Sequence, residues 1–247
     1  MDCLTWEGLG NRINAMASSL VATEGTVYLK WAVNKHCPLP FEEVFDPVPR
    51  VEVQNVFAKR FPYSVKTDRI CYYYVCNPAR IRRKFGCSIT DQYVTLLRSL
   101  IPYKRIKLKQ NSAGLHYRKH MPESPPVPEF IEYARQWLQR RKNPPLFISS
   151  DSSESMEELL KAFPEAIHQN TDRRPKTDFD RTEENFRSWI QALQTFYRCR
   201  AGVLSSTKRS TSLDVIRGYG VRVSYAETKQ NHRNNFIEKR INASSTS

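Results

Sequence analysis

The sequence predicts an α/β fold in which parallel strands alternate with helices, and three observations support this class. Along the second half of the chain, short apolar runs that suit buried strands alternate with longer segments whose apolar residues recur at helical spacing. The chain also opens with a strand, a glycine-containing turn and a helix. Finally, polar turns directly follow three predicted strands, and such strand ends are where open α/β sheets bind ligands.

The first half of the chain begins with a strand, turn and helix unit. A strand is predicted at Asp2–Trp6, followed by a turn at Glu7–Arg12. The helix after the turn has one apolar face, formed by Ile13, Met16, Ala17 and Leu20. A second strand is predicted over Thr26–Val33, and a Pro-bounded loop follows it at His36–Phe41.

The middle of the chain has weaker patterns. No clear period runs from Val48 to Lys66, so no element is predicted there. A Tyr-rich strand is predicted at Ile70–Val75, and an amphipathic helix around Tyr93–Ile101. The stretch from Lys104 to Ser112 is basic and poor in apolar residues, which places a boundary between two lobes near residues 105–112.

The second half alternates regularly. Its predicted strands are Gly114–Tyr117, Leu146–Ser149, Glu165–His168, Gly202–Leu204 and Val221–Tyr225. One helix carries Phe130, Ala134, Trp137 and Leu138, and the next begins at a capping box formed by Asp151 and Glu154. The longest helix is predicted over Thr182–Cys199, and a short one ends at Gly218. This pattern is typical of a parallel sheet with helices on both faces.

The composition predicts a folded chain with an anionic partner. With 247 residues, of which 40% are hydrophobic, the chain can bury a core. Its formal net charge of +14 and its pI near 9.6 call for a partner that carries negative charge. Nucleic acid, a membrane surface and a phosphate-bearing small molecule all fit, and the charge alone does not choose among them.

The cysteine and histidine positions predict neither a metal site nor a disulfide framework. The six cysteines form no C-x-x-C pair, and the five histidines are scattered without ligand spacing. Mostly reduced thiols are therefore expected. The first residues lack a signal-peptide pattern and no apolar run reaches about 18 residues, so we expect a chain that acts in the cytoplasm, of a bacterium or of a virus-infected host.

One predicted strand end concentrates basic side chains. The short strand Gly114–Tyr117 contains His116 and runs directly into Arg118 and Lys119. A guanidinium is a planar, permanently charged fork that fits a phosphate through two hydrogen bonds, so Arg118 is a candidate clamp for a diphosphate. The alternative interpretation is a solvated basic turn that also includes His120.

Two further turns precede predicted helices, at Gly8–Arg12 and Ser205–Ser212. In a turn that opens a helix, the free backbone N–H groups and the helix dipole both favour an anion, and glycine lets a ligand approach the backbone. The alternative is that Gly8 and Gly10 only serve a tight turn.

Taken in order, these segments resemble the fucosyltransferase-like superfamily of inverting glycosyltransferases, and the resemblance covers most of the chain. Gly8–Arg12 is similar to the family's N-terminal GxGN-type turn, and His116-Tyr117-Arg118 to its His-x-Arg motif. Ile148–Asp151 stands where the family has a strand that ends in Asp. Ser206 and Ser210–Ser212 stand where it has a serine-rich phosphate loop.

The resemblance implies a GT-B-like fold, in which two Rossmann-like lobes face each other. Residues 1–110 would form the N-terminal lobe on the acceptor side, and residues 111–247 a compact C-terminal lobe that binds the donor. The implied activity is that of a metal-independent inverting glycosyltransferase without a cofactor. It would move a sugar, with fucose from GDP-fucose as the expected donor, onto a hydroxyl of a glycan or glycoconjugate.

The resemblance also implies roles for individual residues. Arg118 would bind the donor diphosphate and stabilise the charge on the departing nucleotide, a preorganised electrostatic role that needs no metal. The other donor-binding residues would be His116, Lys119, Asp151, Ser206, Ser210 and Ser212, with His116 touching the nucleotide or orienting Arg118. The residues facing the sugar or the acceptor would be Gly8, Gly10, Asn11 and Arg12.

Inversion needs a base that takes the proton of the acceptor hydroxyl. Glu7 is the candidate, because it lies at a predicted strand end beside the glycine turn. Its alternative interpretation is an exposed loop carboxylate. Asp151 could also be a cleft residue, although its predicted capping role is sufficient to explain it.

Three positions depart from the family pattern and leave the donor open. Lys119 stands where many members have a second Arg, Thr211 where they have an aromatic residue, and Ala192 where an Asp approaches the guanine. The same fold with a different nucleotide-sugar donor is therefore the first alternative.

Two other hypotheses follow from the excess positive charge. Basic clusters at Arg80–Lys84, Lys104–Lys109 and Arg140–Lys142 have tyrosines nearby and would suit a basic nucleic-acid-binding protein. No recognisable RNA- or DNA-binding module is present, so nucleic acid is the less expected partner. The last hypothesis keeps the transferase fold and uses the charge for peripheral contact with an anionic membrane.

Overall fold

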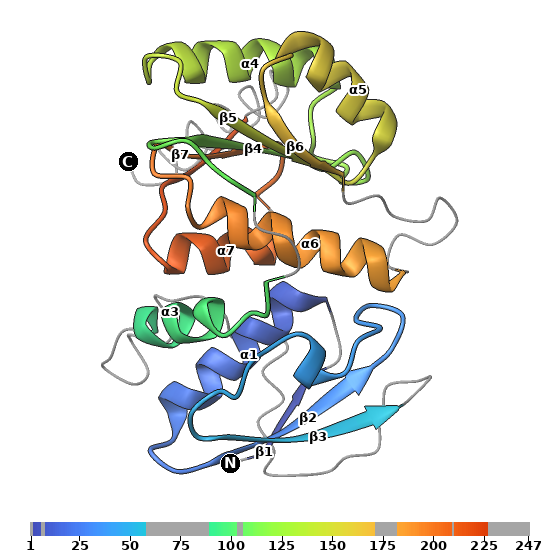
Figure 1. Cartoon of the computed structure of the whole chain (residues 1–247), viewed down its shortest axis with the longest axis vertical. Coiled ribbons are helices and arrows are strands. Elements are labelled where there is room, and N and C mark those ends of the chain that lie inside the picture. Colours follow the sequence, from blue (N-terminus) through green and yellow to red (C-terminus); the bar gives the residue numbers. More distant parts are fainter. Residues whose placement is uncertain are drawn as a thin grey trace, which may run out of the picture.

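Two parallel β-sheets organise the chain (Figure 1). The computed structural model describes residues 2–5, 8–57, 89–102, 106–170, 182–208 and 210–226. The first sheet has three strands and is built from residues before 58, and the second has five strands and is built from residues after 112. The predicted α/β class with parallel strands is confirmed. The boundary predicted near residues 105–112 stays a prediction.

The three-stranded sheet has the order β1-β2-β3. Its strands are β1 (Asp2–Thr5), β2 (Val27–Val33) and β3 (Val51–Phe57), and helix α1 (Leu9–Ala22) connects the first two. The register places Cys3 beside Leu29 and Leu29 beside Val53. A short 3-10 helix, η1 (Phe41–Glu43), lies between β2 and β3.

Strand β3 corrects the absence of any predicted element after Val48. Its sequence, VEVQNVF, places polar side chains on both faces, and none of its residues is buried. The pattern therefore lacks the alternation that signals a half-buried strand. The segment is extended because its backbone pairs with β2 along seven residues. The Tyr-rich strand predicted at Ile70–Val75 lies outside the described residues.

The five-stranded sheet has the order β6-β5-β4-β7-β8, and its strands all run parallel. The strands are β4 (Ala113–Tyr117), β5 (Leu146–Ser150), β6 (Ile167–Asn170), β7 (Gly202–Ser205) and β8 (Val223–Tyr225). All five predicted strands of this half are confirmed, within two residues at each end. The central strand, β4, is buried along its whole length.

Helices cover both faces of this sheet. The apolar side chains of α4 (Val127–Gln139) and α5 (Ser153–Ala162) pack with Leu115 and Ile148 on one face. Those of α6 (Glu183–Phe196) and α7 (Thr211–Gly218) pack with Phe147 and Val203 on the other. Gly114 lets α6 approach closely, because a Cβ there would lie 2.7 Å from Phe196 Cδ1.

The two sheets are joined through helices. Figure 1 shows α6 and α7 between the five-stranded sheet and the pair formed by α1 and α3 (Thr90–Arg98). A single apolar core extends from Leu29 in the first sheet to Val203 in the second. Because α1 is covered by its own sheet and by α7, even its polar residues Asn14, Ser18 and Ser19 are buried.

The first helix begins earlier than predicted. The sequence predicts a turn over Glu7–Arg12, but α1 already starts at Leu9 and only Gly8 precedes it as the N-cap residue. Gly8 has φ −62°, which any residue can adopt, so no left-handed turn is formed there. The predicted apolar face of this helix is confirmed, since Ile13, Met16, Ala17 and Leu20 are all buried.

Within the described ranges, no helix is both long and apolar enough to cross a membrane. Cys3, Cys37 and Cys199 are buried free thiols, as expected for reduced cysteines.

Gly218 tests how tightly the helices between the two sheets are packed. A Cβ at this position would lie 2.2 Å from Tyr93 Cδ2, and Tyr93 is itself held by a 2.9 Å hydrogen bond that its hydroxyl donates to Asn14. Because the ring has no room to move, we expect Gly218→Ala to lower the free energy of unfolding by about 1–3 kcal/mol. Chemical denaturation measures this loss.

Gly25→Ala is the matched control, since the added Cβ would have only an ordinary 3.6 Å contact with Thr23 Oγ1. Its expected change is within about 0.5 kcal/mol. Equal stability of the two variants would contradict close packing between α7 and α3.

Candidate ligand-binding site

The chain order of the five-stranded sheet creates a switch point beside its central strand. The chain runs from β4 to β5 and β6 on one side, and then returns to β7 on the other side of β4. The helices that follow β5 and β7 therefore leave toward opposite faces of the sheet. In open α/β sheets, ligands bind outside the carboxyl ends of the strands at such a point.

The strand register brings the predicted site residues to this point. His116 pairs with Ser149 of β5 and with Ser205 of β7. The residues that follow these strands, among them Arg118, Asp151 and Ser206, therefore reach the same edge of the sheet, as the sequence predicts.

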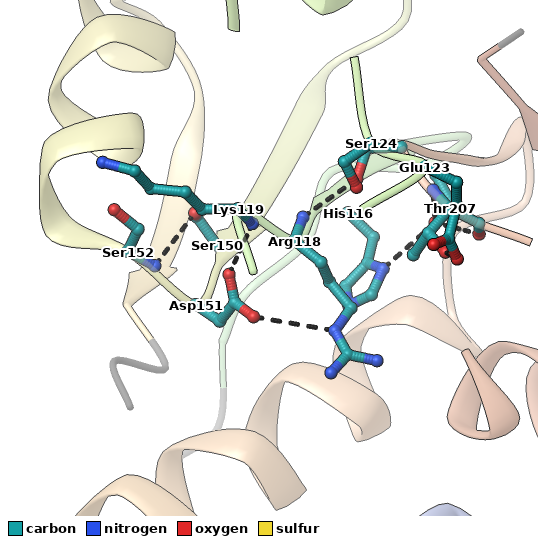
Figure 2. Close-up of polar contacts among 11 residues, drawn as sticks. His116, Arg118, Lys119, Glu123, Ser124, Ser150, Asp151, Ser152 and Thr207 are labelled. Carbon is teal, nitrogen blue, oxygen red and sulfur yellow. Dashed lines mark hydrogen bonds and ion pairs between the residues drawn. The ribbon is translucent and has the colours of Figure 1, made fainter. Parts of the chain in front are cut away.

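Asp151 holds both residues that follow β4. Its Oδ1 accepts a 2.8 Å hydrogen bond from the backbone N–H of Lys119, and its Oδ2 lies 3.6 Å from Arg118 Nε (Figure 2). The carboxylate is only 5% exposed. A buried carboxylate needs such partners, because burying an unpaired charge is costly.

The capping role predicted for Asp151 is wrong. Ser152 is the N-cap residue of α5, and its hydroxyl accepts a 3.3 Å hydrogen bond from the N–H of Ser155. The predicted partner in the capping box, Glu154, instead pairs with Lys119 Nζ. Asp151 is thereby available to orient Arg118.

Lys119 and Glu154 form an exposed pair at the margin of the site. The hydrogen bond and the positive charge of Lys119 lower the pKa of Glu154. Since the Lys119 ammonium is neutralised in this way, Arg118 is the stronger candidate for binding an anion.

The backbone of Arg118 is fixed by β7. Its N–H donates to Ser206 Oγ at 2.9 Å, and the N–H of Ser206 donates to the carbonyl of His116 at 2.9 Å. Ser206 Oγ also lies 2.9 Å from Ser124 Oγ. These bonds tie the loop after β4 to the turn after β7, so Arg118 starts from a rigid backbone.

A second tie joins the same two loops. The hydroxyl of Thr207 donates to the carboxylate of Glu123, and the Thr207 N–H donates to Ser205 Oγ at 3.2 Å (Figure 2). The sequence analysis missed Glu123, Ser124 and Thr207. No signal in the sequence could identify them, because the contacts join segments more than 80 residues apart.

The guanidinium of Arg118 has capacity for a ligand. Its side chain is 14% exposed, and its polar contact with the described residues is made through Nε. Figure 2 shows the two terminal nitrogens beyond this contact, without a dashed partner. These two donors can form the paired hydrogen bonds that a phosphate accepts.

His116 belongs to the interior of the sheet. It is 2% exposed, its Nδ1 lies 3.2 Å from Ser205 Oγ, and its ring centroid lies 5.5 Å from that of Trp189. Its carbonyl supports Ser206, which in turn supports the backbone of Arg118. This places His116 behind Arg118, and direct contact with a nucleotide stays a prediction.

Ser210 and Ser212 lie at the start of α7 and are buried. Ser210 is the N-cap residue, and its carbonyl accepts from the N–H groups of Leu213 and Asp214. Both serines follow β7, as predicted, and their contact with a phosphate stays a prediction.

The residues predicted to face the sugar or the acceptor lie on α1, beside the other sheet. Arg12 is 1% exposed, its guanidinium lies 4.4 Å from the centroid of the Trp31 ring, and Nη2 donates to Asn34 Oδ1 at 3.3 Å. Arg12 is therefore a packed residue of the three-stranded part. Gly8 and Gly10 lie at the start of α1 with Asn11, and Glu7 lies outside the described residues.

Among the described residues, no group of three or more His, Cys, Asp or Glu could hold a metal ion. The absence of a metal site stays a prediction for the whole chain.

The chain was compared with family models, curated proteins and solved structures. No family model matches the chain, and no curated protein matches it. Solved structures do: the NodZ α-1,6-fucosyltransferase soaked with GDP-fucose has a TM-score of 0.56 at 14% identity, over 93% of this chain and 96% of that one.

Two more structures agree. NodZ co-crystallised with GDP has a TM-score of 0.55 at 13% identity, over 87% of this chain and 91% of that one. The fucosyltransferase NodZ from Bradyrhizobium has a TM-score of 0.52 at 13% identity, over 87% and 92%. At this identity the likeness establishes a fucosyltransferase-like fold, and the expected resemblance is confirmed at that level.

Ser206 is predicted to stabilise the site. Ser206→Ala would leave the N–H of Arg118 without its acceptor, so we expect the free energy of unfolding to fall by about 1–3 kcal/mol. Ser99→Ala is the control, because that hydroxyl donates only to a carbonyl of its own helix, Thr95 O. The control should change by less than about 0.5 kcal/mol in the same denaturation experiment. A loss no larger than the control would contradict the role of Ser206.

Tyr117 is expected to make the free energy of unfolding depend on pH in the alkaline range. Burial, and then the negative charges of Asp151 and Glu158, raise the pKa of Tyr117 from its ordinary value of 10.0 to about 12. Because the folded-state pKa is the higher one, the stabilisation is complete below pH 10 and is lost as pH rises toward 12.

Between pH 9 and pH 11 this loss should amount to about 1 kcal/mol. Tyr117→Phe also removes a 2.8 Å hydrogen bond to the carbonyl of Pro125, and it should flatten this part of the pH profile of unfolding free energy. The pKa of Cys199 is also raised to about 12, and this thiol contributes the same pH dependence of unfolding free energy to the wild type and to the variant. Identical slopes in the two proteins would contradict the assignment.

Proposed function

We propose that this chain is a glycosyltransferase that uses a nucleotide-sugar donor, with GDP-fucose as the donor to test first. The observation that carries the proposal is the combination of a fucosyltransferase-like fold over 93% of the chain with a partly exposed guanidinium at the switch point. Two of the similar structures were obtained with GDP-fucose or with GDP.

In this proposal the donor diphosphate binds the terminal nitrogens of Arg118. The ion pair of Asp151 with Nε restricts the orientation of the guanidinium, while Ser206 and Ser124 hold the loop. The fork is thus positioned before the donor arrives. Ser210 and Ser212, at the start of α7, are the proposed hydrogen-bonding partners of the phosphate oxygens.

The proposed reaction inverts the configuration at the anomeric carbon. The acceptor hydroxyl oxygen forms a bond to that carbon while the bond to the diphosphate breaks, and the nucleoside diphosphate leaves with an additional negative charge. Arg118 stabilises this charge directly, so the proposal requires no metal. The acceptor proton passes to a carboxylate, for which Glu7 remains the candidate.

The two sheets have separate roles in the proposal. The part that contains residues 111–247 binds the donor, and the part that contains residues 1–110 holds the acceptor, a hydroxyl of a glycan or glycoconjugate, in a GT-B-like arrangement. In this proposal the packed residue Arg12 would support the acceptor side, with Asn11 nearer to the solvent.

The test is calorimetric titration of the purified protein with GDP, UDP, dTDP and CDP. We expect GDP to bind, and Arg118→Ala to weaken its binding about 10- to 100-fold, because charge-assisted hydrogen bonds to phosphate are lost. Arg118→Lys keeps the positive charge but loses the paired donors of the guanidinium, so its affinity for GDP should lie between those of the wild type and Arg118→Ala. Arg217→Ala is the control for lost charge, since this exposed arginine pairs with Asp214 on α7.

The outcomes separate the hypotheses. Preference for another nucleotide would support a glycosyltransferase with a donor other than GDP-fucose. Absence of nucleotide binding in a folded protein, or equal binding by wild type and Arg118→Ala, would contradict the proposal. Affinity for generic oligonucleotides that falls steeply with salt would favour the nucleic-acid hypothesis instead.

A further inference from the structure

The edge of the five-stranded sheet opposite Arg118 is strongly basic. Five segments precede the strands and meet there because the strands are parallel: residues 106–112, 140–145, 163–166, 197–201 and 219–222. Their basic residues are Lys107, Lys109, Arg140, Arg141, Lys142, Arg198, Arg200 and Arg222. Against these eight cations stands a single carboxylate, Glu165. We call these residues the basic edge.

The edge that carries Arg118 is balanced by comparison. In the described residues that follow β4, β5 and β7, the cations Arg118, Lys119 and Lys208 face the carboxylates Glu123 and Asp151. Arg118 and Lys119 are also paired with carboxylates. The proposed donor site therefore does not account for the positive charge gathered at the basic edge.

Structural roles account for only two of the eight cations. Helices α4 to α7 end at this edge, and cations there compensate the negative ends of the helix dipoles. Arg141 donates to the carbonyls of Trp137 and Ala201, and Arg198 donates to the carbonyl of Ile106. The side chains of the other six, Lys107, Lys109, Arg140, Lys142, Arg200 and Arg222, are exposed.

The cations of the edge are close enough to affect one another. Burial lowers the pKa of Arg141, and the positive charges of Arg222 and Arg140 lower it further. Arg200 and Arg222 line a hollow of about 440 Å³ with Tyr197 and Tyr219, and no carboxylate lines it. Such uncompensated crowding is unfavourable in the free protein, and an anionic partner would relieve it.

Three aromatic rings at the edge are already in contact with other side chains. The rings of Tyr197 and Tyr219 pack against each other at 5.1 Å, and the guanidinium of Arg141 covers the buried Trp137 ring at 3.8 Å. Proteins that hold single-stranded nucleic acid present open rings on which bases stack. The cations of the basic edge come from four loops across about 14 Å of sheet rather than from one groove, and these three rings are not open for stacking.

We propose that the basic edge is a docking surface for an anionic phospholipid membrane. A broad set of exposed Lys and Arg residues matches the surface of a bilayer that contains acidic lipids, where each cation contributes independently. Docking by this edge leaves the opposite edge, with Arg118, open to its ligands. The inference rests on charge and topology, and it does not depend on the proposed glycosyltransferase activity.

Vesicle co-sedimentation of the full chain tests the proposal. We expect binding to vesicles of phosphatidylcholine with phosphatidylserine, and no binding to phosphatidylcholine alone. Binding should be strong near 10 mM salt and weak near 150 mM, since the Debye length falls from about 30 Å to about 8 Å. Because each cation near an acidic membrane contributes about 1 kcal/mol, Arg200→Gln/Arg222→Gln should weaken partitioning about 25-fold.

Lys30→Gln/Lys35→Gln is the matched control, which removes the same charge from β2 and the loop after it. It should bind vesicles like the wild type, and thermal denaturation should confirm that both variants are folded. Vesicle binding that does not depend on phosphatidylserine, or equal losses of vesicle binding in the two variants, would overturn the proposal. A protein that does not bind vesicles but binds a single-stranded oligonucleotide would also overturn the proposal, if the Arg200 and Arg222 substitutions weaken that binding. Nucleotide titration of the same variants reports separately on the donor site.

Discussion

The structure depends on the burial of β4 at the centre of a parallel sheet. Ala113–Tyr117 pairs with β5 on one side and with β7 on the other, and no residue of the strand reaches solvent. Since parallel strands end at the same edge, this one placement brings Arg118, Asp151 and Ser206 together from segments far apart in the sequence. Among the described residues, it also sets a group of paired charges and a group of basic residues at opposite edges of this sheet.

The sequence predicts the elements better than the contacts among them. Helices and buried strands are recovered because their apolar periods differ, as in α1 and β4. Strand β3 is missed because its polar residues break the alternation and only pairing with β2 extends it. The cap of α5 is misassigned by one residue, since Asp151 and Ser152 are both good N-cap residues and only tertiary contacts with Arg118 and Lys119 decide between them.

The same holds for the candidate site: the sequence predicts which residues lie at strand ends, but not the contacts that position them. The residue types at strand ends identify Arg118, Asp151 and Ser206, because their positions along the chain are fixed by the strand boundaries. Glu123 and Ser124 escape prediction, because a Pro-containing loop has no period and its hydrogen bonds reach β7. Burial separates His116 and Arg12 from the more exposed Arg118 and Lys119, and burial of a polar residue is set by packing that the sequence pattern does not encode.

In the proposed donor site, the ion pair between Asp151 and Arg118 would prepare the guanidinium for an anion. A free arginine side chain loses up to about 2 kcal/mol of conformational entropy when a ligand immobilises it. Here the buried carboxylate has already restricted the guanidinium through Nε, and Ser206 has fixed its backbone, so that cost is met on folding. In the proposed function, the terminal nitrogens would then be free of this entropic cost when they bind a diphosphate, which would favour tight and oriented binding.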